Sequence, residues 1–247
     1  MWSRVSITGS TTDMVDVTGL AKVFNRVRAL DGISLRVRRG ETLALFGANG
    51  AGKTTLLKTL ATLVRPSAGG GRVAGHDLLT EREAIRARVG MLAHGHHLYE
   101  ELTATENLRY YGVMYGVPDL GARLGQTLKE VGLEQAATRR VRTFSQGMKR
   151  RLALGCLMLR NPDLLLLDEP YVGLDRQATV LLNDYLLQVR ARGGTILLAT
   201  HNHAQGLALA DRVVVLAGGR VALERQRGEI TAEELRQTGL DPEGGHG

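Results

Sequence analysis

The chain has 247 residues, of which 43% are hydrophobic and 23% are charged, and this composition indicates a globular protein with a sizeable core. Its net charge of +7 is compatible with nucleotide, nucleic acid or anionic membrane partners, and the spread of arginines along the chain favours none of them. A single cysteine, Cys156, excludes an internal disulfide, and the sequence has no apolar run as long as a membrane span.

The N-terminal segment predicts a group of antiparallel strands. Residues 1–13 are polar and lack the apolar core of a signal peptide, so we expect a disordered leader there. Residues 15–24 alternate loosely between apolar and polar side chains, and residues 33–37 alternate strictly, as a half-buried antiparallel strand does. The folded domain is therefore expected to begin at about residue 14.

The strongest motif follows: a short apolar strand over residues 43–46, a glycine-rich turn, and a helix expected to reach about residue 63. The turn fits the pattern G-x-x-x-x-G-K-[ST]. Glycines let the backbone curl so that its N–H groups point at phosphate oxygens, and the positive end of the helix adds to the attraction. Lys53 is expected to reach the β- and γ-phosphates, and the Thr54 hydroxyl to bind Mg²⁺. The predicted triphosphate-binding residues are Gly47, Ala48, Asn49, Gly50, Ala51, Gly52, Lys53, Thr54 and Thr55.

The stretch after this helix mixes turn residues with short strands. Residues 67–71 include three consecutive glycines and predict a flexible loop. A strand expected over residues 89–93 leads into three histidines, His94, His96 and His97. Imidazoles so close together could bind a metal ion or heme, although no cysteine or further histidine is near in sequence.

Three helices are expected in the middle third of the chain. Their expected spans are 106–115, 119–132 and 145–160. Thr103 and Glu106 have the spacing of a capping box, and Asp119 and Ser145 are typical N-cap residues for the other two helices. Cys156 lies among leucines of the third helix, which predicts a buried and unreactive thiol.

Two carboxylates follow a continuous apolar run at residues 164–167. Such a run is typical of a strand buried on both faces of a parallel sheet. At the tip of that strand Asp168 is expected to bind Mg²⁺ through its oxygens, and Glu169 to orient or deprotonate the attacking water. Without the phosphate loop upstream, the same two residues would be interpreted as acidic residues at the point where a strand ends in solvent.

A second anion site is predicted where the third helix begins. Ser145 and Gly147 stand at a helix N-terminus, where backbone N–H groups attract phosphate. The chain then has two phosphate-binding helix starts but one lysine-bearing loop, and two copies arranged head to tail would use both. The plainer interpretation of Ser145 is a structural N-cap.

The remaining segments complete an α/β pattern. We expect a helix over residues 176–192, strands over 195–200 and 212–216, and a hairpin through Gly218 and Gly219. Strands that alternate with helices predict a mostly parallel sheet with helices on both faces. His201 follows the 195–200 strand and could donate a hydrogen bond to the γ-phosphate, while Asp175 could bridge two copies.

Together these motifs resemble those of the ATP-binding cassette (ABC) ATPases over residues 14–224, in the family's order. Residues 47–55 match the Walker A loop, and residues 164–169 match Walker B with its catalytic glutamate. The other matches are the signature at residues 144–148, the D-loop at 173–175, the switch histidine at His201 and the adenine-stacking aromatic ring at Phe24. The resemblance implies that Phe24, Ser145, Gly147 and Asp175 contact ATP and that Glu169 and His201 act in its hydrolysis.

The resemblance also implies an architecture. The fold class is a P-loop NTPase (RecA-like) with a mostly parallel sheet, an antiparallel N-terminal β subdomain and an inserted α-helical subdomain. The core would comprise residues 14–93 and 161–224, the insert about 94–160, and a polar tail 225–247. Members of the family bind ATP and Mg²⁺, form a dimer around two ATP molecules, and drive an integral-membrane subunit. The chain is thus expected as a homodimer at the cytoplasmic face of the inner membrane, without nucleic acid.

The sequence departs from the family pattern at two places, of which the second bears on the transported substrate. The signature has Gln146 and Met148 at positions usually held by glycine and glutamine, and His94 stands where the Q-loop glutamine is expected. Histidine at this place and the sequence around it resemble the ATPase subunit of bacterial heme exporters of cytochrome c maturation. The resemblance therefore implies heme export and a contact of His94 with Mg²⁺ or the attacking water.

Three alternatives remain beside heme export. A drug or polymer exporter ATPase would usually keep the Q-loop glutamine. A soluble machine acting on DNA or ribosomes would carry two cassettes or a long coiled-coil insert, which this sequence lacks. A P-loop kinase would not require the motifs at Ser145, Asp175 and His201 together.

Overall fold

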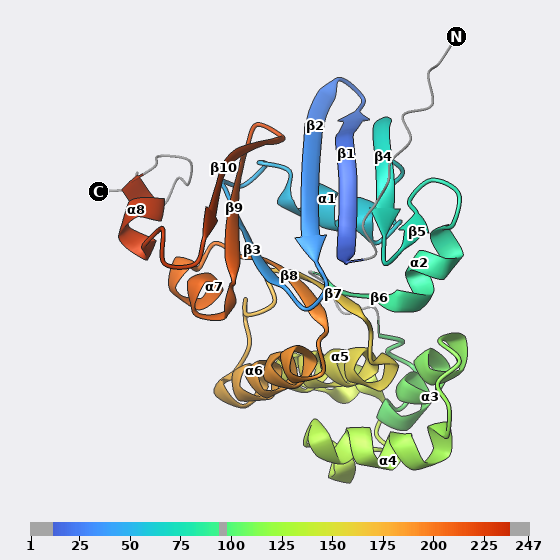
Figure 1. Ribbon diagram of the computed structural model, residues 1–247. Coiled ribbons are helices and arrows are strands. Elements are labelled where there is room, and N and C mark those ends of the chain that lie inside the picture. Colours follow the sequence, from blue (N-terminus) through green and yellow to red (C-terminus); the bar gives the residue numbers. More distant parts are fainter. Residues whose placement is uncertain (1–11, 94–97, 238–247) are drawn as a thin grey trace.

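The computed structural model describes residues 12–93 and 98–237, in which two β-sheets are accompanied by helices (Figure 1). The smaller sheet is antiparallel and contains β1 (Asp13–Phe24), β2 (Val27–Arg38), β4 (Ala68–Val73) and β5 (His76–Asp77). Its strand order is β2-β1-β4-β5. The expected antiparallel group is confirmed. Asp13, expected to end a leader, already belongs to β1, and the carbonyl of Thr12 accepts a hydrogen bond from the Arg39 N–H at 2.9 Å.

The larger sheet carries the nucleotide motifs. Its strands are β3 (Thr42–Phe46), β6 (Val89–Leu92), β7 (Leu164–Asp168), β8 (Thr195–Ala199), β9 (Arg212–Ala217) and β10 (Arg220–Gln226). The order is β10-β9-β3-β8-β7-β6, and all neighbours are parallel except the β9–β10 hairpin. Because parallel strands share one carboxyl edge, the segments that follow β3, β7 and β8 emerge at the same edge, where ligands of open α/β sheets bind.

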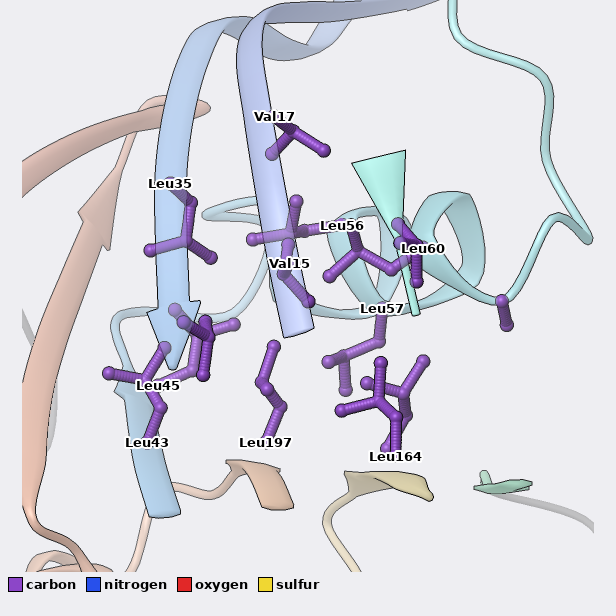
Figure 2. Close-up of a cluster of buried hydrophobic side chains, with 14 of the residues drawn as sticks. Val15, Val17, Leu35, Leu43, Leu45, Leu56, Leu57, Leu60, Leu164 and Leu197 are labelled. Carbon is purple, nitrogen blue, oxygen red and sulfur yellow. The ribbon is translucent and has the colours of Figure 1, made fainter. Parts of the chain in front are cut away.

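One hydrophobic core fills the space between the two sheets. Helix α1 (Lys53–Leu60) lies in it, and Figure 2 shows Leu56 and Leu57 of this helix beside Val15 of β1 and above Leu164 of β7. Each fully buried leucine contributes about 1.5–3 kcal/mol relative to an exposed one, so aliphatic packing compensates for the scarcity of aromatic residues. The helix ends at Leu60, before its expected end near residue 63, because Thr62 has a left-handed backbone (φ 61°).

A second core lies on the opposite face of the larger sheet, below it in Figure 1. It is built by α3 (Ala104–Met114), α4 (Leu120–Glu130), α5 (Gln146–Arg160) and α6 (Arg176–Ala191). Along β7, Leu164 and Leu166 belong to the first core and Leu165 and Leu167 to the second, so the predicted burial on both faces is confirmed. Cys156 of α5 is buried there, and burial raises the pKa of its thiol to about 12.

The predicted N-cap residues form capping hydrogen bonds with their side chains, with one exception. Thr103 and Glu106 form the predicted capping box of α3, and the Ser145 hydroxyl accepts a hydrogen bond from the Met148 N–H at 3.2 Å. Asp119 precedes α4 as expected, but its left-handed backbone (φ 50°) leaves it without a capping hydrogen bond from its side chain. The position of that cap was thus predicted correctly and its chemistry was not.

The prediction of a flexible loop at residues 67–71 is wrong. Residues 68–71 belong to β4, and Gly71 pairs with Val17 of β1. A side-chain carbon built on Gly71 would lie 2.6 Å from the Val17 Cα, and one built on Gly69 would lie 2.6 Å from the Leu20 nitrogen. These glycines therefore permit close approach of two strands, which the sequence pattern alone does not distinguish from loop flexibility.

Several short elements were not expected. They are α2 (Arg82–Arg88), α7 (His203–Leu209), α8 (Ala232–Gln237) and the 3₁₀ turns Glu134–Ala136 and Val141–Thr143. Within the segment expected as a polar tail, β10 continues to Gln226, and Ile230 and Leu235 pack against Phe46 and its neighbours in a third, smaller core. None of the helices in the described part of the chain has the length and apolarity that a membrane crossing requires.

Candidate nucleotide and catalytic site

The loop between β3 and α1 needs glycine at both ends. Gly47 and Gly52 have φ values of 136° and 106°, which side chains rarely adopt. A carbon built on Gly47 would overlap the carbonyl group of Leu216 in β9, and one built on Gly52 would lie 2.5 Å from the Ala29 oxygen in β2. The loop is thus enclosed by two neighbouring strands, which fix its curvature.

The β9–β10 hairpin supports this loop from behind. The Gly219 N–H donates to the Ala51 carbonyl at 3.1 Å, and the Gly219 carbonyl accepts from the Asp31 N–H at 2.8 Å. The Asp31 carboxylate pairs with Arg28 at 2.8 Å and with Arg220 at 2.7 Å, and hydrogen bonds from these two arginines lower its pKa. Of these residues only Ala51 belongs to the sequence motif, and the Gly218-Gly219 pair indicated only a hairpin turn.

The start of α1 is open toward an anion. Gly52 is the N-cap and offers no side chain, and the first turn contains no acidic residue. Four backbone N–H groups at a helix start have no partner within the helix, so they are available to phosphate oxygens. Lys53 is only 8% exposed, and its ammonium donates to the carbonyls of Gly47 and Ala48, the latter at 3.1 Å. The ammonium is therefore held at the loop itself.

A hard-cation site fits beside this loop. Asp168 ends β7, is 6% exposed, and its carboxylate makes no hydrogen bond or ion pair with any residue of the described ranges. The Thr54 hydroxyl on the first turn of α1 is likewise without a described partner. A buried carboxylate without a partner is costly, and Mg²⁺ is the kind of ion that one carboxylate, one hydroxyl and phosphate oxygens bind. Within residues 12–93 and 98–237 there is no cluster of three metal-ligating side chains that would indicate a closed transition-metal site.

Glu169 is held in an unusual backbone conformation. Its φ is 50°, its N–H donates to the Ala199 carbonyl at 2.9 Å, and its carbonyl accepts from Val172 at 3.2 Å. A left-handed non-glycine residue costs about 1–3 kcal/mol and persists only where its surroundings impose it. The turn directs the Glu169 carboxylate to His201, whose Nδ1 lies 2.9 Å from Oε2. The two predicted catalytic residues, from the ends of β7 and β8, are thus brought together.

The second predicted anion site lies on α5. Ser145 caps this helix, and Gly147 packs so closely on Asp175 that a carbon built on it would lie 3.4 Å from the Asp175 Cγ. Asp175 itself caps α6 by accepting from the Ala178 N–H at 2.7 Å. No hydrogen bond among the described residues joins Ser145 or Gly147 to the 47–55 loop of the same chain. These residues therefore form a separate group within one copy.

Three further predicted site residues differ in their exposure or in whether the structure describes them. Phe24 is 46% exposed at the end of β1, and the Lys22 ammonium lies 4.9 Å from its ring centroid. Thr55 is half-buried on the first turn of α1. His94, with His96 and His97, lies outside the described residues.

Comparison with known proteins places this site in a family. The family model described as ABC transporter matches residues 30–172. A daunorubicin resistance ATP-binding protein of Streptomyces coeruleorubidus is 39% identical over 89% of this chain and 70% of its own length. A Nod factor export ATP-binding protein of Ralstonia nicotianae is 36% identical over 91% of this chain and 70% of its own length.

Solved structures agree with this placement. A structure described as the ATP-binding subunit of an ABC transporter is 33% identical, with a TM-score of 0.81 over 93% of this chain and 94% of that one. A dimeric ATP-binding cassette with ADP and phosphate, 23% identical, has a TM-score of 0.78 over 88% of this chain and shows the same fold. The chain belongs to the ABC transporter family, as an ATP-binding subunit with the family's ATPase fold and activity.

Proposed function

We propose that this chain hydrolyses ATP as the motor subunit of an ABC exporter for a drug or polymer. The observation that supports hydrolysis is the Glu169–His201 pair at the carboxyl edge of the sheet that also presents the nucleotide loop. Glu169 would accept the proton of the attacking water. Lys53, the loop N–H groups and the start of α1 would hold the phosphates.

The hydrogen bond within the catalytic pair sets a condition on His201. With Nδ1–H donating to Glu169, the Nε2 atom can donate to a phosphate oxygen only when the imidazole is protonated on both nitrogens. Asp168 and Thr54 would hold Mg²⁺, which when bound neutralises part of the phosphate charge. Phe24 would stack on the adenine ring.

A dimer of two copies would complete each site. Ser145 and Gly147 stand apart from the nucleotide loop of their own chain, which supports a role toward the nucleotide of a second copy. The positive end of α5, without an acidic residue in its first turn, suits a phosphate there.

A membrane subunit would dock on the helical subdomain. Helix α3 and the segment before it expose five large apolar side chains, namely Tyr99, Tyr110, Val113, Met114 and Tyr115, and the rings of Tyr99 and Tyr110 are in contact. A contiguous exposed apolar patch in a soluble domain often marks a protein interface. The patch therefore supports attachment of the chain to an integral-membrane partner at the cytoplasmic side.

The comparisons favour drug or polymer export over heme export. The relatives reported above have names that refer to daunorubicin resistance and Nod factor export, and a linearmycin resistance ATP-binding protein of Bacillus subtilis is 32% identical over 84% of this chain. The heme expectation depended on His94 and its neighbours, and the names of these three relatives refer to drug resistance or Nod factor export and not to heme. Affinity capture from membrane extract, followed by identification of the spanning subunit, distinguishes the two cargoes.

The decisive test of the motor function is Glu169→Gln. Loss of the general base is expected to lower kcat about 100-fold or more, while the amide keeps the side-chain volume and nucleotide affinity. The variant should accumulate as a dimer with Mg-ATP in size-exclusion chromatography. Unchanged turnover would remove Glu169 from its assigned role, and a monomer that hydrolyses ATP normally would instead favour a single-site P-loop enzyme.

A further inference from the structure

We propose that Arg150 is a positioning residue that fixes the catalytic loop, defined as residues 169–175, to helix α5. This inference builds on the proposed function, in which α5 serves the partner's nucleotide and Glu169 serves its own. Arg150 would make these two groups of one chain move together, so that ATP closure at one site aligns the glutamate at the other.

The catalytic loop is folded by its own hydrogen bonds. The Val172 N–H donates to the Glu169 carbonyl at 3.2 Å, and the Leu174 N–H donates to the Tyr171 carbonyl at 3.1 Å. Two successive turns of this kind make the loop a compact unit. A force applied at Val172 is therefore transmitted to Glu169 through one hydrogen bond.

Hydrogen bonds of Glu169 and Tyr171 serve as two anchors of this unit, to the sheet and to α6, and Asp175 adds a packing contact with Gly147 of α5. The Glu169 N–H donates to Ala199 of β8, and the Tyr171 hydroxyl donates to Asn183 of α6 at 2.8 Å. Neither anchor involves α5. The Arg150 side chain supplies the hydrogen bond that does, because its Nη1 donates to the Val172 carbonyl.

Gly173 leaves room for the Arg150 guanidinium. Gly173 has a φ of 65°, and a carbon built on it would lie 2.7 Å from the Arg150 Cζ. The guanidinium thus lies directly on the Gly173 backbone. Any side chain at residue 173 would displace Arg150 as well as strain the turn.

The same arginine faces the catalytic carboxylates. Arg150, Asp168 and Glu169 line one cavity of about 60 Å³, together with apolar residues from β6 and α6. The Arg150 Nε is enclosed and donates to no described residue. The positive charge of Arg150 lies beside the Glu169 carboxylate that must be aligned. Its effect on this carboxylate is therefore electrostatic as well as steric.

Substitutions of Arg150 test this role. In Arg150→Ala we expect kcat to fall about tenfold through misplacement of Glu169. Nucleotide affinity of the monomer should change little, because Arg150 donates its hydrogen bond to Val172 and not to the 47–55 loop. The Hill coefficient for ATP should fall from about 2 toward 1, since coupling between two sites is what the anchor provides. Arg150→Gln should recover part of both effects, because its amide can still donate to the Val172 carbonyl.

Arg151→Ala is the matched control. Arg151 is the next residue of α5, and its guanidinium donates to the carbonyls of Val131 and Gly132 at the end of α4. Its loss removes the same charge and two hydrogen bonds but leaves the catalytic loop untouched. It is expected to lower the Tm without changing the Hill coefficient. If Arg150→Ala and Arg151→Ala lower kcat equally, or if Arg150→Ala keeps the wild-type kcat and Hill coefficient, the positioning role is wrong.

The two proposals fail in different ways. Wild-type protein without ATP hydrolysis, or Glu169→Gln protein that never dimerises, contradicts the motor function. A wild-type enzyme that hydrolyses ATP cooperatively and an Arg150→Ala variant that does the same contradict the positioning role alone.

Discussion

Helices α1 and α5 both begin at motifs assigned to phosphate, but their first turns are built differently. At α1 the N-cap is Gly52, which has no side chain and a left-handed backbone, and the lysine that follows returns to the loop carbonyls. At α5 the N-cap is Ser145, whose hydroxyl already accepts from the Met148 N–H. Within the described part of the chain, the first-turn donors of α1 therefore have no partner, whereas those at α5 are partly satisfied.

The difference teaches how each helix start depends on its surroundings. The α1 start is rigid because β2, β9 and the Gly219 turn enclose the loop, so its geometry is prepared before nucleotide arrives. The α5 start is stable without any anion, because its own serine caps it and Asp175 packs against Gly147. Because the α5 start needs no anion for its stability, it can remain exposed to solvent until a second copy brings a bound nucleotide to it.

The largest expected effect comes from Gly47→Ala, which would break the α1 start. The new carbon would collide with the Leu216 carbonyl at a φ that alanine rarely adopts, and strain and overpacking together cost about 3 kcal/mol. We expect nucleotide affinity to fall about 100-fold, measured by titration with a fluorescent ATP analogue. Gly32→Ala is the control, because Gly32 also has a positive φ (78°) but no atom within 4 Å of the new carbon. Equal affinity losses in both variants would show that strain alone, and not enclosure by β9, controls the loop.

Ser145→Ala should have an intermediate effect and sharpen the contrast. Loss of the cap is expected to lower the free energy of unfolding by about 1 kcal/mol, measured by urea denaturation. In the Glu169→Gln background the ATP-dependent dimer should also weaken, while nucleotide binding to the monomer stays intact. Ser145→Thr retains the hydroxyl and should restore both properties. A dimer of unchanged strength in Ser145→Ala would leave Ser145 with a purely structural role.

The smallest effect is expected from Asp31→Asn, in the support behind the α1 loop. Arg28 and Arg220 lower the pKa of Asp31 below its ordinary value of 3.8. The ionised carboxylate therefore stabilises the fold at pH values above 3.8. That contribution is lost as the pH falls through the lower folded-state pKa. The Tm difference between wild type and variant should thus be small and constant near neutral pH and vanish in acid, because exposed ion pairs contribute little.

Asp184→Asn is the control for the charge change. Asp184 is exposed on α6 and makes no ion pair with any residue in the described ranges. Because Asp184 makes no such pair, its substitution should leave the Tm nearly unchanged over the same pH range. A Tm difference for Asp31→Asn that persists down to pH 2 would mean that the Arg28 and Arg220 pairs do not stabilise the hairpin.

The sequence was sufficient where a residue's role is local. The pattern from Gly47 to Lys53 predicts its own turn, the leucine run of β7 predicts burial on two faces, and Ser145 predicts a cap, because each depends on its immediate neighbours. These features place Glu169 and His201 at strand ends that share an edge, and so their meeting follows from the parallel order of β7 and β8.

The sequence was insufficient where a residue's role depends on a distant partner. Gly69 and Gly71 suggested a loop because nothing nearby shows that β1 approaches them. No motif marks the contacts of Arg150 and Gly219. Val172 is 22 residues from Arg150, and Ala51 lies in the nucleotide loop, far from Gly219 in sequence. The substrate is further removed, because a motor subunit contacts its membrane partner and not the cargo.

The burial of Cys156 makes this chain convenient for labelling. A thiol with a pKa of about 12 in the core between α3 and α5 is almost entirely protonated at neutral pH, and it reacts slowly with maleimides or methanethiosulfonates. A new cysteine at Leu187, which is 56% exposed on α6, would be modified selectively in an otherwise natural sequence. Because each copy would then carry one spin label, a single interchain distance would report directly on how far two motors close during turnover.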